Sequence, residues 1–419
     1  MKPAKLILAA AAVLAAIVPN ATAAGAQTVT RYGAVHACTT GQVRCNALIL
    51  TRNGIRVAAA TPAVLPSGYG PAEYHGAYSL PTTAPSGNVT IAIVDAFDDA
   101  TIAKDLKKYD KTFGIRNLKK CTSKVTTSCF EKMNLGASPG SAVAPGWDVE
   151  IALDVETAHA ICQNCKIVLV EAVNDSFPHL EAAENTAATQ GGVISNSWGL
   201  YGYDGASPPD DAAFNHPNKA IVVSSGDNGY GVEWPAVLNT VISVGGTSLT
   251  VGAGDTYVSE KTWGPIPGHK WGTGSGCASG AVTGASPVPA LSSQAGVAGY
   301  SATGCGSSRG DNDVSANADP ETGSAVYASS TGWMQVGGTS LAAPLIAGVI
   351  ALQDDFATAT YPASIIYAHA GTSAFRDVTT GSDDAGHWLL PCTHTSACNA
   401  VAGYDLPTGV GTPNGTAGF

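Results

Sequence analysis

Charged residues and long apolar runs are both scarce in this sequence. Asp, Glu, Lys and Arg make up only 13% of the chain, and an excess of acids gives a net charge of -11 at pH 7. A nucleic-acid-binding protein needs a basic surface that neutralises phosphates, so this charge balance argues against nucleic acid as a partner. Beyond the N-terminal segment, no apolar run approaches the roughly 20 residues of a membrane-spanning helix. We therefore expect neither nucleic-acid binding nor a membrane span.

The N-terminal segment has the pattern of an export signal. A basic start is followed by thirteen uncharged residues, Leu6 to Val18, and then by small residues that end at Ala23. This apolar stretch is too short to cross a bilayer as a helix, and the small residues fit a cleavage site. We expect residues 1–23 to be a signal peptide and the mature protein to be secreted.

An exported chain meets an oxidising compartment, so the ten cysteines are expected to form disulfides. Cys162 and Cys165 could instead form half of a zinc site or a redox pair, but no second Cys or His pair has matching spacing. Successive cysteines lie close together in the chain. We predict five local bridges: Cys38 with Cys45, Cys121 with Cys129, Cys162 with Cys165, Cys277 with Cys305, and Cys392 with Cys398.

The chain divides near residue 75. Residues 24–74 show no sustained helical or strand period, and we interpret them as a short pro-segment or linker. Beyond them lie continuous β-branched runs that are typical of buried parallel strands, at 89–95, 166–172, 193–198, 220–225 and 241–244. Helical patterns lie between them at 101–113, 149–160 and 178–189.

This alternation predicts the α/β class, a parallel sheet flanked by helices within one large domain. Residues 250–330 are rich in Gly and Ser, and we expect them to form long surface loops. The carboxyl ends of parallel strands meet at one edge of such a sheet, where active sites gather. We therefore look for functional side chains at that edge.

Ser340 has the setting of an activated serine. It follows the glycines of Val336-Gly337-Gly338-Thr339-Ser340, and an apolar helical pattern begins directly after it. The free N–H groups and the dipole of a helix N-terminus stabilise negative charge on oxygen. The alternative is a plain helix N-cap serine. Ser308 also fits a Gly-x-Ser-x-Gly elbow, but it has no strand before it and no helix after it.

Two acids, Glu150 and Asp154, lie four residues apart in a helical pattern and thus share one face of that helix. Apolar residues surround them in the sequence. Two buried carboxyl groups at this spacing repel as anions, so one of them is expected to retain a proton and share it with its neighbour. Such a pair can supply a base and a group that orients it. The alternative is a solvated acidic face on a surface helix.

The segment Gly338-Thr339-Ser340-Leu341-Ala342-Ala343-Pro344 resembles the nucleophile segment of subtilisins and sedolisins, which are serine peptidases. A subtilisin-like enzyme needs a base histidine after its first strand, and none of the nine histidines lies in such a segment. The segment from Glu150 to His159 instead resembles the base segment of sedolisins, the serine-carboxyl peptidases. The resemblance covers almost everything from about Ala77 to the C terminus.

This resemblance implies a subtilisin-like fold and a catalytic domain over residues 75–419. It implies Ser340 as the nucleophile, Glu150 as the general base and Asp154 as the partner of that base. Asp227 follows a predicted strand in Ser-Gly-Asp-x-Gly and is implied to donate a hydrogen bond to the oxyanion, for which its carboxyl group must be protonated.

The resemblance also implies binding residues. An extended substrate would pair with the edge formed by Ser197, Trp198 and Gly199, and Trp198 could alternatively be a core residue. Two C-terminal segments resemble the calcium loops of sedolisins. They imply one structural Ca²⁺ ion bound by the side chains of two acids and by three backbone carbonyls: Asp377, Val378, Val401, Gly403 and Asp405.

We therefore expect a secreted, monomeric endopeptidase that acts on proteins or peptides in acid through an acyl-enzyme. Two other functions stay open from the sequence. One is a subtilisin-like peptidase that uses a histidine together with Asp95, which ends the first strand pattern. The other is a secreted binding protein that retains an inactive peptidase scaffold.

Overall fold

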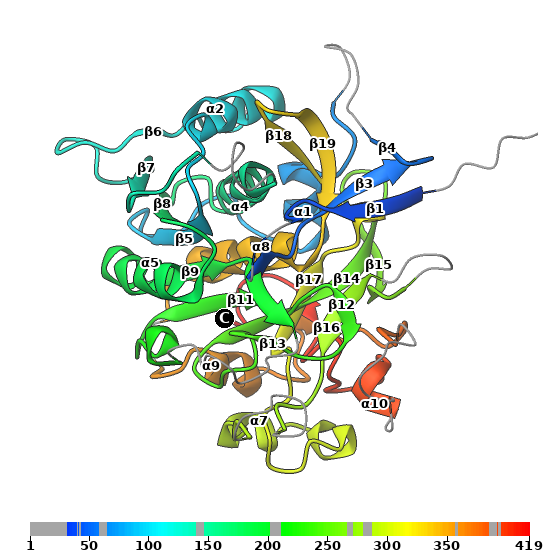
Figure 1. Cartoon of the computed structure of the whole chain (residues 1–419). Helices are drawn as coiled ribbons and strands as arrows, with labels where there is room; N and C mark the ends of the chain where they lie inside the picture. The colour runs from blue at the N-terminus through cyan, green and yellow to red at the C-terminus, as the bar shows by residue number, and fades with distance from the viewer. Residues whose placement is uncertain are drawn as a thin grey trace, which may run out of the picture.

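The computed structural model describes residues 32–39, 41, 43–57, 65–139, 146–201, 211–265, 271–279, 287–356, 359–384, 392 and 395–419. The predicted signal peptide lies outside these residues. The described residues form a central β-sheet with helices packed around it and a second, smaller sheet beside it (Figure 1). Within these ranges no helix has the length and apolar character that a membrane span requires.

The central sheet has nine strands, and all of its pairings are parallel except that of β14 with β15. This confirms the predicted α/β class. In spatial order the strands are β15 (Tyr257–Thr262), β14 (Ile242–Val251), β11 (Ala220–Ser224), β9 (Val193–Asn196), β5 (Thr90–Ala96), β8 (Lys166–Ala172), β7 (Cys129–Asn134) and β6 (Lys119–Lys120), and β17 (Val314–Asn317) also pairs with β14.

The two central helices, α4 and α8, pack against each other and against strands of this sheet. Helix α8 has apolar or small residues on all sides and is buried over almost its whole length, which suits a helix in the middle of a domain. The helices are α1 (Pro71–Ala77), α2 (Ile102–Phe113), α4 (Trp147–Ile161), α5 (Phe177–Gln190), α7 (Ser292–Ala295), α8 (Thr339–Gln353), α9 (Ala363–Ala368) and α10 (Thr395–Cys398).

The N-terminal segment differs from the sequence interpretation, because it contains strands that join the domain. Strands β1 (Tyr32–His36) and β3 (Leu48–Arg52) form a hairpin, and β3 also pairs with β19 (Gly332–Gly337). Strands β4 (Ile55–Arg56) and β18 (Ser324–Ala328) complete this sheet. A run as short as Leu48-Ile49-Leu50 shows little period, and its strand partner β19 lies far away in the sequence.

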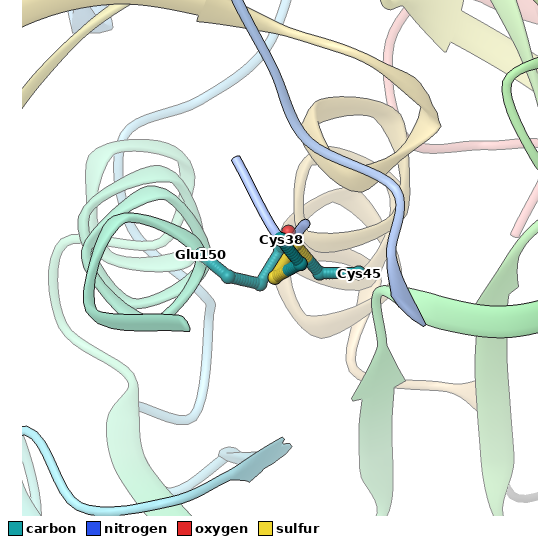
Figure 2. Close-up of side chains that lie close together, drawn as sticks. All are labelled: Cys38, Cys45 and Glu150. Carbon is teal, nitrogen blue, oxygen red and sulfur yellow. A yellow bond between two sulfur atoms is a disulfide. The ribbon is translucent and has the colours of Figure 1, made fainter. Parts of the chain in front are cut away.

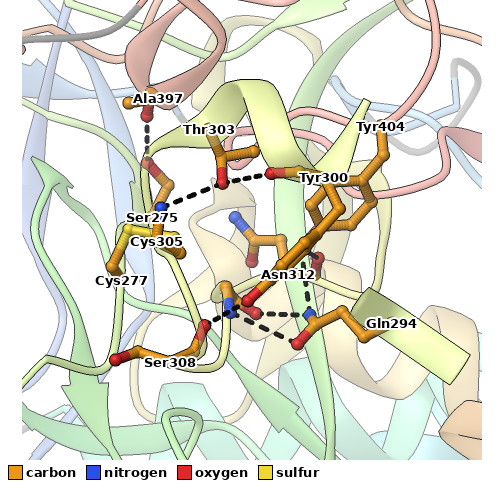
Figure 3. Close-up of a disulfide and its surroundings, with 11 residues drawn as sticks. Ser275, Cys277, Gln294, Tyr300, Thr303, Cys305, Ser308, Asn312, Ala397 and Tyr404 are labelled. Carbon is orange, nitrogen blue, oxygen red and sulfur yellow. Dashed lines mark hydrogen bonds between the residues drawn. A yellow bond between two sulfur atoms is a disulfide. The ribbon is translucent and has the colours of Figure 1, made fainter. Parts of the chain in front are cut away.

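The region after residue 250 is also more ordered than expected, because it contributes β15 and β17 to the central sheet. Smaller pairings elsewhere join β2 (Arg44–Cys45) and β13 (Glu233–Trp234) to β10 (Trp198–Tyr201), β12 (Asn228–Tyr230) to β16 (Gly272–Ser275), and β20 (Phe375–Arg376) to β21 (Thr412–Pro413). All five predicted disulfides are formed. The Cys277–Cys305 bridge closes the loops around Tyr300 (Figure 3).

Candidate active site

Ser340 lies at the second residue of α8, where the chain turns out of β19 through Gly338. Gly338 has φ 94°, a conformation that favours glycine. A Cβ atom on it would lie 2.0 Å from the carbonyl oxygen of Asn46 and 2.6 Å from Oδ2 of Asp227. The Ser340 side chain is buried, and its hydroxyl donates a hydrogen bond of 2.9 Å to the carbonyl oxygen of Ser197.

Three buried carboxyl groups form a cluster beside this serine. Glu150 and Asp154 lie on α4, Asp95 lies near the end of β5, and none of their carboxyl oxygens has a hydrogen-bond partner. Burial, followed by the charges of Asp154 and Asp95, raises the pKa of Glu150 well above its usual value, while the nearby Ser340 hydroxyl lowers it. Burial also raises the pKa of Asp154 and brings that of Asp95 to about 8.

This arrangement brings together the predicted serine and its two predicted acids. The cluster stays protonated at pH values well above those at which carboxyl groups usually ionise, because several negative charges in one buried space repel one another. A carboxyl group next to the serine hydroxyl is placed to exchange a proton with it once one group of the cluster is ionised.

No histidine among the described residues hydrogen bonds to Ser340 or to the acid cluster. His159, on the same helix as Glu150, interacts through Nε2 with the carbonyl oxygen of Arg116 at 2.7 Å. Burial lowers the pKa of His159 to about 4. His75 interacts with the carbonyl oxygen of Ala160 at 2.9 Å. Neither histidine has a hydrogen bond to the serine.

Asp227 follows β11 and lies under the turn that delivers Ser340. Its Oδ1 accepts hydrogen bonds from the backbone N–H of Thr339 at 2.7 Å and from the Thr339 hydroxyl at 2.8 Å. Its Oδ2 is buried without a partner. Burial raises the pKa of Asp227 well above its usual value, and the two bonds from Thr339 lower it only in part. A protonated Oδ2 is therefore a free hydrogen-bond donor at this turn.

The predicted substrate edge at Ser197, Trp198 and Gly199 is paired with part of the same chain. Strand β2 runs antiparallel to β10, with Cys45 opposite Trp198 and Arg44 opposite Gly199. The indole of Trp198 points into the core, where its Nε1 donates to the carbonyl oxygen of Val94 at 2.9 Å and its ring contacts two other aromatic rings, Phe214 and Trp234. Only the backbone of Trp198 lies at the edge.

The Cys38–Cys45 disulfide lies directly against Glu150 (Figure 2). The two sulfur atoms and a carboxylate oxygen of Glu150 all lie within 4.8 Å of one another. This group is not a metal site, because a disulfide has no thiolate to coordinate a metal. The disulfide instead covers the carboxyl group with apolar atoms and contributes to its burial.

The predicted calcium residues come together on two C-terminal loops. The backbone N–H of Gly403 donates to Asp377 at 2.9 Å, and that of Val401 donates to Asp405 at 2.8 Å. Burial raises the pKa of Asp405 to about 7, and the charge of Asp377 adds to this effect. Asp377 and Asp405 are thus electrostatic neighbours on these loops, and carboxylate oxygens are ligands that a hard cation prefers.

Hydrogen bonds of Asn312 anchor the loop that carries Asp405, and Figure 3 shows Asn312 close to Tyr404 of this loop. Asn312 donates through Nδ2 to the carbonyl oxygens of Leu406 at 2.8 Å and Gly274 at 2.7 Å. The Tyr404 hydroxyl donates to the carbonyl oxygen of Asn312 at 3.1 Å. The loop is therefore positioned by the core of the domain.

Sequence reasoning missed two parts of the site. Asp95 was considered only for the histidine alternative, whereas the structure places its carboxyl group within the acid cluster. A signal was present, since an acid at the end of a buried parallel strand lies at the active-site edge. The second part is the segment Arg44–Asn46, which was assigned to a pro-segment or linker. Its local sequence gives no indication that it lies against Ser197.

Comparison with known proteins supports the resemblance to serine peptidases that the sequence indicated. The model of the subtilase family matches residues 151–383, which is more than half of the chain. Kumamolisin from Bacillus sp. (strain MN-32) is 28% identical over 84% of this chain and 63% of its own length. Sedolisin from Pseudomonas sp. (strain 101) is 26% identical over 82% of this chain and 59% of its own length. The chain thus spans about three fifths of the length of these relatives.

Among solved structures, Pseudomonas sedolisin, described as a serine-carboxyl proteinase in complex with pseudo-iodotyrostatin, superposes with a TM-score of 0.64. It is 23% identical, and the match covers 83% of this chain and 95% of the sedolisin chain, which supports a shared fold. The predicted resemblance and the predicted subtilisin-like fold are thereby confirmed. The chain belongs to the subtilase family, and its similarity to kumamolisin and sedolisin assigns it to the sedolisin group of that family.

Proposed function

We propose that this protein is a serine peptidase in which Ser340 is the nucleophile and the carboxyl group of Glu150 is the general base. The observation that carries the proposal is the position of a buried acid cluster beside the Ser340 hydroxyl. Asp154 and Asp95 share protons with Glu150, so that a single negative charge in the cluster can be exchanged among neighbours. The lack of a histidine contact to Ser340 in the described residues favours a carboxylate base over the subtilisin-like alternative.

In the proposed mechanism, Glu150 takes the proton of Ser340 as the hydroxyl attacks a peptide carbonyl. The backbone N–H of Ser340 and the protonated Oδ2 of Asp227 donate hydrogen bonds to the oxyanion. Glu150 then returns the proton to the leaving amine, and water hydrolyses the acyl-enzyme by the same steps. Protein or peptide chains are the proposed substrates, and they pair with the backbone of Ser197, Trp198 and Gly199.

This mechanism requires an ionised cluster at Glu150 and a protonated Asp227, which produces a bell-shaped pH profile. We propose that its maximum lies in acid. Burial raises the pKa of both groups, and part of the burial of Glu150 comes from the Cys38–Cys45 disulfide. Displacement of the Cys38–Cys45 disulfide from the site would admit water to Glu150 and lower the pKa of Glu150 towards its usual range.

We further propose that Asp377 and Asp405, with the carbonyls of Val378, Val401 and Gly403, hold one structural Ca²⁺ ion. When bound, the ion would neutralise two adjacent acids and fix the loops against the core. The export pattern and the disulfides support secretion, and a monomer is the form proposed for the secreted protein.

The decisive experiment is a pH profile of hydrolysis on a denatured protein substrate, with Ser340→Ala and Glu150→Gln measured alongside. An acidic maximum that both variants abolish supports the proposal. A maximum near pH 8 that depends on a histidine would identify the subtilisin-like alternative. No turnover and no labelling of Ser340 by a fluorophosphonate would identify a binding protein on an inactive scaffold.

A further inference from the structure

The active site is occupied by a segment of its own chain in an extended conformation. Opposite β10, the N–H of Asn46 donates a hydrogen bond of 3.0 Å to the carbonyl oxygen of Ser197, which continues the antiparallel pairing of Arg44 and Cys45. Backbone pairing with a free strand edge is a general way for an extended peptide to bind. Residues 44–46 therefore lie as a bound peptide would lie.

The carbonyl group of Asn46 points at the donors of the proposed oxyanion site. The N–H of Ser340 donates to the Asn46 oxygen at 3.1 Å. The partnerless Oδ2 of Asp227 faces the same place, since a Cβ on Gly338 would lie close to both oxygens. The Ser340 hydroxyl and the Asn46 N–H donate to one acceptor, the Ser197 carbonyl. The Asn46–Ala47 peptide bond thus lies beside the nucleophile with its carbonyl oxygen in the donor site.

The side chain of Asn46 is enclosed in a polar pocket. Its Nδ2 donates to Oγ of Ser224 at 3.0 Å and to Oε2 of Glu233 at 3.2 Å. Oε1 of Glu233 accepts from Nδ2 of Asn228 at 3.0 Å. Asn46 is 4% exposed and Glu233 is 2% exposed, so this pocket is closed to water. Gly226 leaves room for the acid, because a Cβ on it would lie 2.4 Å from the Glu233 carboxyl carbon.

This chemistry selects among side chains. The Asn carboxamide supplies N–H donors to the two acceptors, whereas Asp supplies a second acid that faces Glu233. Leu would leave the acceptors of Ser224 and Glu233 buried without a donor, which a site built for hydrogen bonding rejects strongly. Gln carries the same group one methylene further out and would no longer place it at hydrogen-bond distance from both acceptors with the same backbone position.

We propose that Ser224, Asn228 and Glu233 form a specificity pocket for asparagine on the acyl side of the cleaved bond, and that Asn46–Ala47 is the bond that the protein cleaves in its own chain. This inference rests on the proposed function. The Ser340 oxygen bonds to the Asn46 carbonyl carbon, the bond to the Ala47 nitrogen breaks, and Glu150 passes its proton to that nitrogen. Water then releases the Asn46 carboxyl group and restores the Ser340 hydroxyl.

The same contacts block the site before cleavage. The segment fills the substrate edge, and its disulfide covers Glu150 (Figure 2). Both Cys38 and Cys45 precede the proposed cleaved bond, so the disulfide does not hold the two new ends together. Ala47 would become the N-terminus of β3, which stays paired with β19. The released residues include β1, so the site opens once β1 also separates from β3.

The first test follows the chain itself. Full-length wild-type protein and its Ser340→Ala variant are incubated at a series of pH values from acid to mildly alkaline, because burial keeps the pKa of the covered Glu150 well above its usual value. Intact mass and N-terminal sequence are then measured. We expect a wild-type product that begins at Ala47 and no such product from Ser340→Ala. In two matched variants, Asn46→Asp and Asn46→Leu, cleavage at this bond should be slower by at least about tenfold.

The second test measures specificity in trans with the peptide Val-Arg-Ser-Asn-Ala-Leu-Ile-Leu, in which Ser replaces Cys45, and with its Asp, Gln and Leu counterparts at the Asn position. We expect the Asn peptide to have a kcat/KM at least about tenfold above the others. Glu233→Ala should reduce the ratio of kcat/KM on the Asn peptide to kcat/KM on the Leu peptide. A cooperative thermal unfolding curve shows independently that the variant is folded.

The outcomes separate this inference from the proposed function. An enzyme that hydrolyses a denatured protein in acid but leaves Asn46–Ala47 intact, or that shows no preference for Asn, overturns the inference alone. A wild-type protein that cleaves neither a denatured protein nor its own chain overturns the proposed function, and the inference is rejected with it.

Discussion

Asp227 is bound to Thr339 through one carboxyl oxygen only. Oδ1 accepts from both the N–H and the hydroxyl of Thr339, while Oδ2 stays buried without a partner next to the turn before Ser340. The two oxygens of this group are therefore in different environments. One holds the turn in position, and the other is available to an oxyanion only while it carries a proton.

Asp227→Asn tests this division directly. The amide oxygen can accept the two bonds from Thr339, and the NH₂ group then replaces Oδ2 as a donor that does not titrate. We expect hydrolysis to persist at a lower rate and the alkaline limb of the pH profile to disappear. The measurement is kcat/KM against pH for both proteins. An unchanged alkaline limb would show that another group limits the rate there.

Glu150→Gln should lower kcat at least about 10³-fold, because the amide cannot take the Ser340 proton. The same substitution removes a buried group whose pKa is raised, so stability at neutral pH should be kept or improved. Assays on protein substrate and thermal unfolding at pH 7 check both effects. Retained activity would reject Glu150 as the base, and loss of the fold would be visible in the unfolding curve.

Stability should decrease as the pH rises from about 5 to 8. Burial raises the pKa of Glu184 to about 8 and that of Asp110 to about 7, whereas both groups ionise near pH 4 in an unfolded chain. As the pH rises, these two groups lose their protons in the unfolded state first. Their contribution to the free energy of unfolding is therefore complete below pH 4 and is lost as the pH rises from there to the folded pKa values. Buried His159 has the opposite effect on stability. Its folded pKa is lowered to about 4, so its contribution makes the protein less stable as the pH falls below about 6.5.

Thermal unfolding between pH 4 and pH 8 measures this effect. Glu184→Gln removes one titrating group, so the decrease in Tm between pH 5 and pH 8 should be smaller in this variant than in the wild type. A half-buried acid on the same helix gives the matched control, and Glu181→Gln should leave the slope unchanged. Equal slopes in all three proteins would contradict the role of Glu184.

Chelation should lower Tm if the C-terminal loops hold Ca²⁺. Without the ion, Asp377 and Asp405 repel each other across the loops, so the native state loses the binding free energy of the ion. The measurement compares Tm with added Ca²⁺ and with chelator. In the double variant Asp377→Asn and Asp405→Asn, Ca²⁺ should no longer change Tm. A Ca²⁺ response that persists there would place the ion elsewhere.

The local elements of this protein follow from its sequence. Uninterrupted β-branched runs predicted strands at 166–172 and 220–225, and the structure has them at 166–172 and 220–224. The spacing of Glu150 and Asp154 predicted a shared helix face. The glycines before Ser340 predicted the turn at the start of α8. Pairs of cysteines close in the chain also predicted the disulfides, because short loops bring their thiols together.

Only the tertiary structure decided which distant groups meet. Asp95 lies near Glu150 because helix α4 packs against strand β5. No local sequence pattern predicts that packing. Arg44–Asn46 lies in the active site because β3 pairs with β19 and β2 pairs with β10. These are long-range backbone pairings, which depend on the whole sheet being assembled. The composition of residues 24–74 is therefore compatible with a linker, whereas the fold makes part of that segment the occupant of the site.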